Sequence, residues 1–151
     1  MKAIIACDPN GGIGYQNKLP WDKIQGDLPR FKQLTMNQVV VMGRNTWDSL
    51  PKKPLIGRLN LVITTREIYM PPGALAIRNL DHFTIFHDAW VIGGASLINS
   101  CWHMLDEIHL TKTFTEYTCD TFIDLLYLEQ HYTMAHDETY SDHTYQIWKR
   151  K

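Results

Sequence analysis

The sequence of 151 residues lacks long hydrophobic runs, a cysteine framework and an excess of charge of one sign. No stretch approaches the roughly 18 apolar residues that a membrane-spanning helix needs, and the apolar run at the N-terminus is too short for a signal peptide. The three cysteines are an odd number without a C-x-x-C pair, which argues against disulfides and structural zinc sites. Fifteen Lys and Arg residues against 16 Asp and Glu residues give no basic field for nucleic acid or an anionic membrane. We therefore expect a cytoplasmic protein without nucleic-acid or membrane partners.

The length and composition fit one domain over residues 1–151. The charges are unevenly distributed, because residues 1–66 carry ten Lys and Arg and four Asp and Glu, whereas residues 67–151 carry five and twelve. Either the first part holds a small anionic ligand, or two faces of one fold differ in their solvated charges. The seven histidines show no ligand-like pairing with carboxylates or thiols, so we expect no metal site.

Short apolar, β-branched runs predict strands that are buried on both faces, as in a parallel sheet covered by helices. Three later segments have the pattern of strands without helices between them, and the last two predict an antiparallel pair at the sheet edge. We therefore predict a single-domain α/β fold with a mixed, mostly parallel central sheet, helices on both faces and an antiparallel C-terminal hairpin. The predicted strands are residues 3–7, 39–42, 60–64, 74–77, 89–92, 107–113, 132–137 and 145–148, and the predicted helices are residues 27–36, 45–50, 81–86 and 95–105.

Three of the predicted strands end in turns that suit a ligand with phosphates. Gly43-Arg44-Asn45-Thr46 and Gly93-Gly94-Ala95-Ser96 each lead into a helix whose first N–H groups favour anions, and Thr64-Thr65-Arg66 adds hydroxyls and a cation. Ligands of open α/β sheets bind beyond the carboxyl ends of the strands, so these turns favour a nucleotide with several phosphates. The patterns G-x-G-x-x-G and G-x-x-x-x-G-K-[ST] are both missing, which excludes a standard Rossmann site and a P-loop.

The most specific features are short motifs in a fixed order. They are Ile13-Gly14-Tyr15-Gln16-Asn17-Lys18-Leu19-Pro20-Trp21 with Asp27-Leu28-Pro29-Arg30-Phe31 after it, Met42-Gly43-Arg44-Asn45-Thr46-Trp47, Pro54-Leu55-Ile56-Gly57-Arg58-Leu59-Asn60, Ile92-Gly93-Gly94 and Asp120-Thr121-Phe122. On these motifs the chain resembles the dihydrofolate reductase family over nearly its whole length. The resemblance implies reduction of 7,8-dihydrofolate to 5,6,7,8-tetrahydrofolate, with hydride transfer from nicotinamide C4 to pterin C6 and protonation of N5. It also implies a role in one-carbon and thymidylate metabolism, and we expect a monomer.

The resemblance assigns the substrate site to side chains around Asp27. From the residues alone, Asp27 is a carboxylate at a helix N-terminus; in the family it would accept N–H groups of the pterin ring. Asp22 is the rival acid, but its spacing from Trp21 fits the family less well. Arg58 would bind the α-carboxylate of the glutamate tail. The implied catalytic residues are Asp27, Leu19, Trp21 and Thr111, and the implied substrate-binding residues are Ile4, Ile5, Asp27, Leu28, Phe31, Lys32, Leu50, Leu55, Arg58, Ile92 and Thr111.

The resemblance also implies NADPH rather than NADH as the cofactor. The cations and hydroxyls near Arg44 and Thr64 would surround its 2′-phosphate, and the Gly93–Gly94 peptide, cis in the family, would lie at its pyrophosphate. The loop of residues 9–21 would close over the site, in contact with Asp120. The implied cofactor-binding residues are Ala6, Ile13, Gly14, Asn17, Leu19, Gly43, Arg44, Asn45, Thr46, Thr64, Thr65, Arg66, Arg78, Gly93, Gly94, Ala95, Ser96, Leu97, Ile98 and Thr121.

The chain departs from the family pattern at three places. Ile98 stands where many members have a tyrosine beside the nicotinamide, Ile56 replaces a proline, and Ile123-Asp124 replaces an aromatic residue and a proline. None of these changes removes a group that the chemistry requires. Two alternatives remain open: a reductase of the same fold for another heterocycle, such as a riboflavin precursor, and a folate- or nucleotide-binding structural subunit with little turnover.

Overall fold

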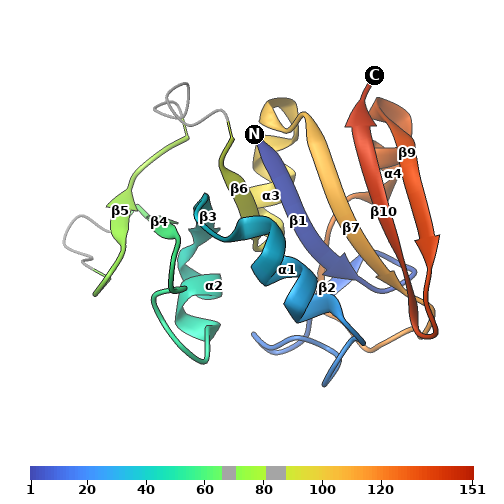
Figure 1. Ribbon diagram of the computed structural model, residues 1–151, viewed down its shortest axis with the longest axis horizontal. Helices are drawn as coiled ribbons and strands as arrows, with labels where there is room; N and C mark the ends of the chain where they lie inside the picture. The colour runs from blue at the N-terminus through green and yellow to red at the C-terminus, as the bar shows by residue number, and fades with distance from the viewer. Residues whose placement is uncertain (66–70, 81–87) are drawn as a thin grey trace.

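The computed structural model describes residues 1–65, 71–80 and 88–151, and this described part contains an eight-stranded sheet of order β5-β4-β3-β6-β1-β7-β10-β9 (Figure 1). The inner strand β1 pairs in parallel with β6 on one side and β7 on the other, and β3 pairs in parallel with β4 and β6. The predicted mixed, mostly parallel α/β fold is therefore confirmed. The strands are β1 (Lys2–Cys7), β3 (Val39–Gly43), β4 (Leu59–Ile63), β5 (Leu75–Ile77), β6 (Trp90–Gly93), β7 (Glu107–Thr113), β9 (Tyr132–Thr139) and β10 (His143–Arg150).

Alternate residues of the inner strands supply two apolar cores, one on each face of the sheet. On β3, Val40 and Met42 belong to one core, here called the α1 core, while Val41 belongs to the other, the α3 core. The α1 core is covered by α1 (Asp27–Thr35) and α2 (Arg44–Ser49), and the α3 core by α3 (Ala95–Cys101) and α4 (Leu125–His131). The buried members of the α1 core are Ile4, Val40, Met42, Trp47, Val62 and Trp90, and those of the α3 core include Ala3, Val41, Val91, Ile98, Ile108, Leu110 and Leu128.

One predicted helix is shorter in the structure, and another lies outside the described residues. Residues 95–105 are not one helix, because α3 ends at Cys101 and a 3₁₀ turn follows at Trp102–Met104. This tighter turn pairs the N–H of Leu105 with the carbonyl of Trp102, which satisfies a helix-end acceptor before the chain enters β7. The predicted helix at residues 81–86 lies outside the described residues. Within the described ranges, no helix has the length and hydropathy needed to cross a bilayer.

The prediction that no helix separates the last three strands is wrong. Between β7 and β9 lie α4 and the short strand β8 (Thr121–Phe122), which pairs antiparallel with β2 (Gly12–Gly14). Asp124 caps α4 by accepting the N–H of Tyr127 at 3.0 Å. Leu128 is the only fully buried residue of α4, so the apolar periodicity that identifies a helix is weak there. The antiparallel C-terminal hairpin is confirmed, because β10 pairs antiparallel with both β9 and β7.

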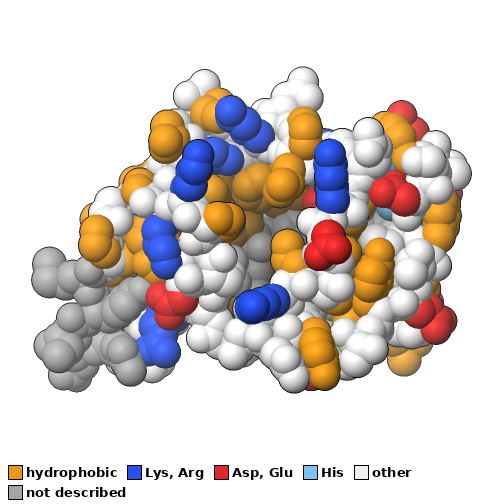
Figure 2. All heavy atoms as spheres, turned by 90° about the horizontal axis from the view of Figure 1, so that it is seen from below, with side chains coloured by type: hydrophobic (Ala, Val, Ile, Leu, Met, Phe, Trp, Pro, Cys, Tyr) orange, Lys and Arg blue, Asp and Glu red, His pale blue; other side chains and the backbone are white. Residues whose placement is uncertain are grey.

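The parallel strands all end at one edge of the sheet. This edge is the lower one in Figure 1, where the arrows of β1 and β7 end. Figure 2 looks onto it and shows a surface that is hollowed near its centre, with Lys and Arg side chains on both sides of the hollow. The turns after β3, β4 and β6, which carry the predicted phosphate-binding residues, therefore meet at this edge.

Packing of the α3 core predicts that two Leu→Ala substitutions differ strongly in their effect on the free energy of unfolding. Leu110 is 1% exposed on β7, and Leu126 is 64% exposed on α4. Leu110→Ala should lower the free energy of unfolding by about 3 kcal/mol, because it leaves a cavity between packed elements. Leu126→Ala should lower it by less than about 0.5 kcal/mol. Urea denaturation of both variants measures the difference, and equal losses would contradict the central place of Leu110.

Candidate active site

Asp27 and Thr111 meet where α1 begins over the end of β7. Asp27 is the first residue of α1, after Gly26, whose φ of 79° lies in the left-handed region that glycine tolerates. Thr111 is buried at 3% exposure, and its hydroxyl donates to Oδ1 of Asp27 at 2.7 Å. The structure therefore joins this predicted pair directly, whereas the rival acid Asp22 is exposed in the segment before the helix.

Arg30, which the sequence prediction missed, lies one turn after Asp27. Its Nη1 donates to Oγ1 of Thr111 at 3.3 Å, and its Nη2 lies 3.3 Å from Nε2 of His143. The guanidinium packs on the ring of Tyr145, with Cζ 4.2 Å from the ring centroid. The available signal was the spacing of three residues, which places Asp27 and Arg30 on one face of the helix. The partners on β7 and β10 gave no signal in the sequence.

The apolar side chains predicted for the substrate site form a graded surface from core to solvent. Ile4 is buried in the α1 core, and Ile5 points to the other face of β1, where it approaches Gly93. Leu28 is 70% exposed on α1, and Lys32 is exposed beside it. Covering an apolar side chain of this exposure with a ligand lowers the free energy of the complex. The half-buried members of the set, packed against the α1 core, are Phe31, Leu50, Leu55 and Ile92.

The guanidinium of Arg58 is fixed at the end of α1 by contacts on two sides. Its Nη1 donates to Oγ1 of Thr35 at 3.1 Å, and its Nε donates to the carbonyl of Ile56 at 3.0 Å. Its Cζ lies 5.9 Å from the centroid of the Phe31 ring. Burial lowers the pKa of Arg58, yet a guanidinium of this kind stays charged at neutral pH. Because the protein holds these two donors, the orientation of the remaining N–H fork is set before a carboxylate arrives.

The ends of β3 and β6 form a glycine cradle, defined by Gly43, Gly93 and Gly94 with Thr46 against it. A Cβ placed on Gly94 would lie 3.4 Å from Oγ1 of Thr46, and one placed on Gly43 would lie 3.8 Å from the amide nitrogen of Gly94. The Gly93–Gly94 peptide is cis, and Gly93 has a φ of 131°. Helices α2 and α3 follow the cradle, and no side chain caps the first N–H groups of either helix. This bare, donor-rich backbone fits the pyrophosphate of a dinucleotide cofactor.

Ala95, Ser96, Leu97 and Ile98 form the first turn of α3, and they divide between the cradle and the core. Ser96 is exposed, while Leu97 and Ile98 are 8% and 1% exposed in the α3 core. Ile98 therefore packs inward, and its N–H bonds to the carbonyl of Gly94 within the helix. A contact of this turn with a ligand would run through Ser96 and the backbone.

The residues predicted around a 2′-phosphate lie at the ends of β3, β4 and β5. Arg44 forms an ion pair with Asp48 on α2, with Nε 3.6 Å from Oδ2, while Asn45 beside it is exposed. The N–H of Thr64 donates to the carbonyl of Ile77, the last residue of β5. The exposed Arg78, directly after β5, therefore lies near Thr64. Thr65 is exposed. Arg66 lies outside the described residues.

The segment from residue 9 to 21 is tied to the sheet at its start by Asp8. Asp8 is fully buried, and its Oδ1 accepts the N–H groups of Asn10 and Gly12 at 2.9 and 2.8 Å. Its Oδ2 accepts the N–H of Tyr117 at 3.0 Å. The predicted loop is thus partly a strand: Gly14 pairs with Thr121 across β2 and β8, and Ile13 is buried in the α3 core.

The tip of this segment is a tight turn that leans on Asp120. Gln16 and Asn17 have φ values of 50° and 62°, and Tyr15 and Lys18 pair across them. The N–H of Gln16 donates to Oδ2 of Asp120 at 2.9 Å, and this contact holds the pKa of Asp120 below its usual value. Thr121 also donates to Asp120, through its hydroxyl.

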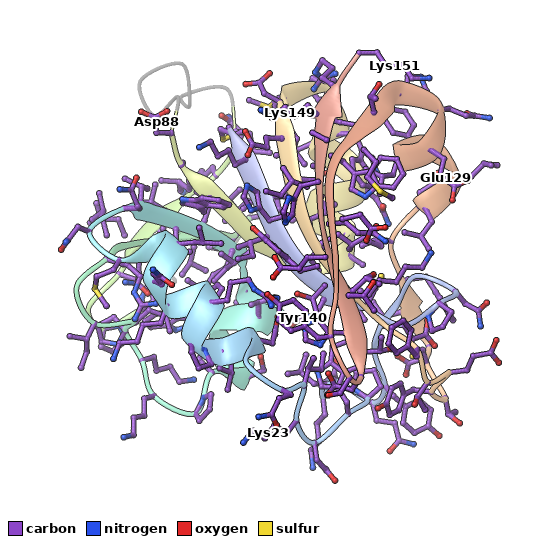
Figure 3. All side chains as sticks on the ribbon, turned by 45° about the vertical axis from the view of Figure 1, so that its right-hand side comes forward. Lys23, Asp88, Glu129, Tyr140, Lys149 and Lys151 are labelled. Atoms are coloured by element: carbon purple, nitrogen blue, oxygen red, sulfur yellow. The ribbon has the colours of Figure 1, made fainter. Side chains whose placement is uncertain are left out.

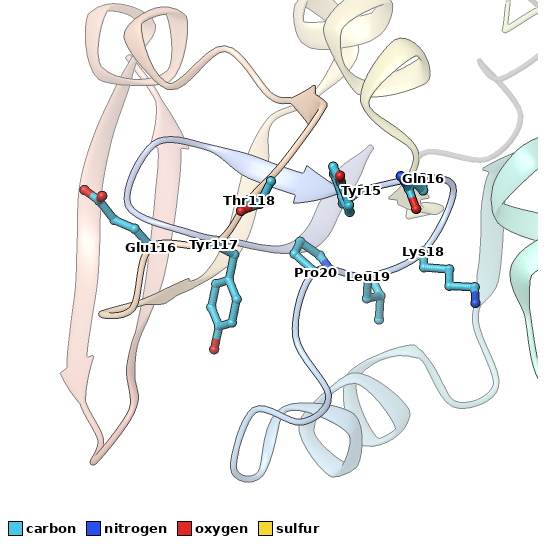
Figure 4. A pocket seen from close by; sticks show the side chains of 8 residues that line it. All are labelled: Tyr15, Gln16, Lys18, Leu19, Pro20, Glu116, Tyr117 and Thr118. Atoms are coloured by element: carbon cyan, nitrogen blue, oxygen red, sulfur yellow. The ribbon is translucent and has the colours of Figure 1, made fainter.

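Beyond the turn, the chain borders an open pocket. This pocket of about 470 Å³ lies between residues 15–20 and 116–118 (Figure 4). Leu19 is 65% exposed at its rim, and Trp21 is buried against Tyr117, with ring centroids 5.7 Å apart. Cys7, at the end of β1, is fully buried, and burial raises its pKa to about 12. Its thiol therefore stays protonated and unreactive at neutral pH.

Comparisons with known proteins agree with this geometry. A family model described as dihydrofolate reductase matches residues 1–150. Dihydrofolate reductase type 8 of Escherichia coli is 37% identical over 163 aligned residues, which cover 100% of this chain and 96% of that protein. Dihydrofolate reductase of Neisseria gonorrhoeae is 34% identical over 123 residues, covering 79% of this chain and 75% of that protein.

A solved structure extends the likeness to the fold. Dihydrofolate reductase from Enterococcus faecalis, complexed with NADP(H) and RAB-propyl, has a TM-score of 0.86 and 26% identity, and the match covers 99% of this chain and 95% of that one. The chain is thus an NADPH-dependent oxidoreductase by fold and family. The chain belongs to the dihydrofolate reductase family, and its reaction is the reduction of dihydrofolate.

The contact between Asp120 and Gln16 predicts that loss of the Asp120 carboxylate makes the turn at residues 15–18 more accessible to proteolysis. Asp120→Ala removes the acceptor of the Gln16 N–H and of the Thr121 hydroxyl. Because both groups are exposed, the fold should persist, while the bond after Lys18 should become accessible to trypsin more often. We expect cleavage after Lys18 to be severalfold faster than in the wild type. Glu116→Ala, an exposed carboxylate at the rim of the same pocket, is the control; equal acceleration in that variant would argue against the role of Asp120.

Proposed function

We propose that dihydrofolate and its cofactor bind side by side at the carboxyl edge of the sheet, the pterin at Asp27 and the cofactor at the glycine cradle. The observation that carries this proposal is the order of the strands. The Asp27–Thr111 pair lies at β7 and the cradle at β6, and β1 runs between these two strands. Ile5 and Ala6, near the end of β1, therefore separate the two subsites by the width of one strand.

In this proposal Asp27 binds the pterin ring and Arg58 binds the glutamate tail. An ionised carboxylate accepts two N–H groups of a planar heterocycle, and the fixed guanidinium of Arg58 donates its free N–H groups to a carboxylate at the other end of α1. The half-buried side chains between them, with the exposed Leu28, supply the apolar walls. Lys32 adds a diffuse positive charge near the tail.

The cofactor NADPH would be held by the cradle, by the first turns of α2 and α3, and by the hydroxyls and cations after β3 and β4. When bound, it supplies the hydride that reduces C6 of the pterin. Thr46 and Ser96 would face the pyrophosphate, and Arg44, Thr65 and Arg78 would face the 2′-phosphate. The turn at Gln16 and Asn17, with Leu19, would lie over the nicotinamide, and Gly14 and Thr121 would fix the base of that turn.

The contribution of the protein to the reaction is binding, orientation and electrostatics. The carboxylate of Asp27 places a negative charge beside the ring, which favours a proton on the pterin at N5. Thr111 orients that carboxylate by donating to one of its oxygens. Trp21 and the apolar walls exclude water from the reacting atoms and so strengthen these interactions.

We further propose that residues 1–151 form a single domain that acts as a cytoplasmic monomer without nucleic-acid partners. The net charge of −1 argues against a nucleic-acid partner, and the odd number of cysteines argues for a reducing compartment. Sedimentation of the purified protein at micromolar concentration tests the oligomeric state.

Replacement of Asp27 tests the proposed pterin subsite. Asp27→Asn keeps the shape of the side chain but removes its charge and one acceptor. At pH 7 we expect kcat/KM for dihydrofolate to fall by at least about 100-fold, because ring binding and N5 protonation both depend on the carboxylate. The affinity for NADPH, measured by fluorescence titration, should stay within about twofold. A wild-type protein that binds both ligands without turnover would instead support the binding-subunit alternative.

Replacement of Arg58 tests the tail subsite separately from the ring subsite. Arg58→Met keeps the stem against Phe31 but removes the charged fork. We expect KM for dihydrofolate to rise by about tenfold to 100-fold, as one charge-assisted contact is lost. A dihydropteridine without the glutamate tail should be reduced at the same rate by the variant and the wild type. If kcat/KM of the variant falls equally for dihydrofolate and for the dihydropteridine, Arg58 supports the fold of the site and does not recognise the tail.

A further inference from the structure

A chain of polar contacts runs behind Asp27, from α1 to the hairpin of β9 and β10, and the proposed function does not use it. It begins at the Thr111 hydroxyl, continues through the guanidinium of Arg30 to Nε2 of His143, and ends where Nδ1 of His143 meets Oδ1 of Asp142 at 2.6 Å. The other carboxylate oxygen of Asp142 accepts the N–H of Gln25 at 3.0 Å, just before α1. The contacts thus lead back to the segment just before α1.

The chemistry of these groups fixes the direction of each hydrogen bond. A guanidinium only donates, so the Thr111 oxygen accepts from Arg30. The single hydroxyl hydrogen of Thr111 is then directed to Asp27, the acceptor 2.7 Å away. A hydroxyl hydrogen in this place bonds more strongly to an ionised carboxylate than to a protonated carboxyl group, so it favours the ionised form.

The same argument fixes the ring of His143. Because Nη2 of Arg30 donates, Nε2 of His143 must accept, and the ring hydrogen is therefore on Nδ1, facing Asp142. The side chain of His143 is fully buried, so the ring cannot turn to water. A hydrogen on Nε2 would point at the N–H groups of the guanidinium, where it has no acceptor. The ring is therefore held in the tautomer with its hydrogen on Nδ1.

Two tyrosines hold the guanidinium in its plane. Its Cζ lies 4.2 Å from the ring centroid of Tyr145 and 5.1 Å from that of Tyr140. Tyr140 in turn stacks on His143 with an interplanar angle of 8°. In Figure 3 the labelled Tyr140 lies beside α1 at the lower end of the hairpin. Arg30 therefore has a defined position, as a charge must have if it is to act on a neighbour through one hydroxyl.

From this geometry we infer that Arg30 is a positioning residue of the dihydrofolate site. Its guanidinium sets the Thr111 hydroxyl as a donor to Asp27 and favours the ionised form of that carboxylate, which the pterin ring requires. The inference rests on the proposed function of Asp27 as the pterin-binding group. It adds to that function a second residue, on the same helix, that touches neither the substrate nor the cofactor.

Other charged and titratable groups surround Arg30. On β9, Glu138 accepts the hydroxyl of Tyr140 at 2.6 Å, and this hydrogen bond, with smaller effects of His136 and Arg30, lowers its pKa. On β10, Tyr145 has a raised pKa because of burial, so it stays neutral. On β7, His109 bonds to Glu107, two residues before Thr111. Asp142 is kept ionised because the Gln25 N–H lowers its pKa. Of these groups, Arg30 is the cation that contacts Thr111.

Arg30→Met tests the inference, because it removes the charge and the donors but keeps an apolar stem between the tyrosines. We expect KM for dihydrofolate to rise about tenfold while the Kd for NADPH stays within about twofold. The midpoint of the pH dependence of kcat/KM should move to higher pH, since loss of a cationic neighbour favours a protonated carboxyl group. Steady-state kinetics from pH 5 to 9 and fluorescence titration of dihydrofolate measure both effects.

A double-mutant cycle with Thr111→Val tests whether Arg30 acts through Thr111. In the Thr111→Val background, Arg30→Met should change KM by less than about twofold. Additive effects of the two substitutions would overturn the inference. Arg30→Lys keeps the charge but not the fork, so KM should rise while the pH midpoint stays near that of the wild type; a shifted midpoint in this variant would also count against it.

Lys149→Met is the matched control, because it removes one positive charge from β10 at the end of the strand opposite to Tyr140 (Figure 3). It should leave KM and the pH midpoint unchanged. If Arg30→Met binds dihydrofolate as the wild type does and keeps its pH midpoint, Arg30 only packs between the tyrosines and the inference is wrong. Failure of the wild type to reduce dihydrofolate would instead overturn the proposed function, and the direct titration still measures the effect of Arg30 on binding.

Discussion

Parallel pairing of β1 with both β6 and β7 is the constraint on which the site depends. Parallel neighbours require the chain to cross back over the sheet after each strand, so β1, β3, β6 and β7 all end at the same edge. The register places Ala6 of β1 opposite Thr111 of β7, while Gly93 lies at the end of β6. Groups that are far apart in the sequence thus arrive within one or two strand widths. No local interaction of Asp27 or of the glycine cradle would produce this arrangement without the register of the sheet.

The position of Asp27 depends on how α1 is held over that sheet. Its apolar side, with Phe31 and Leu34, packs on the α1 core. Its polar side is held by Arg30, by the contact of Gln25 with Asp142, and by the bond of Arg58 to Thr35. Apolar packing alone is non-directional and would let a nine-residue helix rotate or slide by a fraction of a turn. Directional hydrogen bonds at both ends of α1 fix its rotation, and with it the direction of the Asp27 carboxylate.

The sequence predicted the parts of this structure that depend on local pattern. The apolar runs placed β3 and β4 within one residue of their observed bounds, and the ordered motifs placed Asp27, Arg58 and the cradle. It did not predict β2, β8 and α4, because their apolar faces are short and their pairing joins segments over 100 residues apart. Nor did it predict the partners of Arg30, since the contact with His143 spans 113 positions of sequence. Polar pairs of this separation leave no periodicity, whereas buried strands do.

The face of the sheet beneath α1 is divided into an apolar and a polar half, and the division explains why the site can hold a charge. On β3, β4 and β6 the face is apolar, and it ends at Trp90, whose ring meets His109 of β7 edge-on, with centroids 5.0 Å apart. Beyond this boundary, His109 bonds to Glu107 at 2.7 Å and to the hydroxyl of Tyr145. Burial lowers the pKa of His109, so the ring is neutral and links these groups without adding a second cation beside Arg30.

Every buried side-chain nitrogen and oxygen in the described residues has a partner, which is the condition for a polar layer of this kind to be stable. A wholly apolar face would give α1 a larger core but would leave the Asp27 carboxylate against hydrocarbon, where its ionised form is costly. The polar half of the face therefore buries less apolar surface than a wholly apolar face would. It provides Asp27 with a hydroxyl donor, Thr111, and with the fixed cation of Arg30 one hydrogen bond further on. It also leaves an edge at which a heterocycle can replace water.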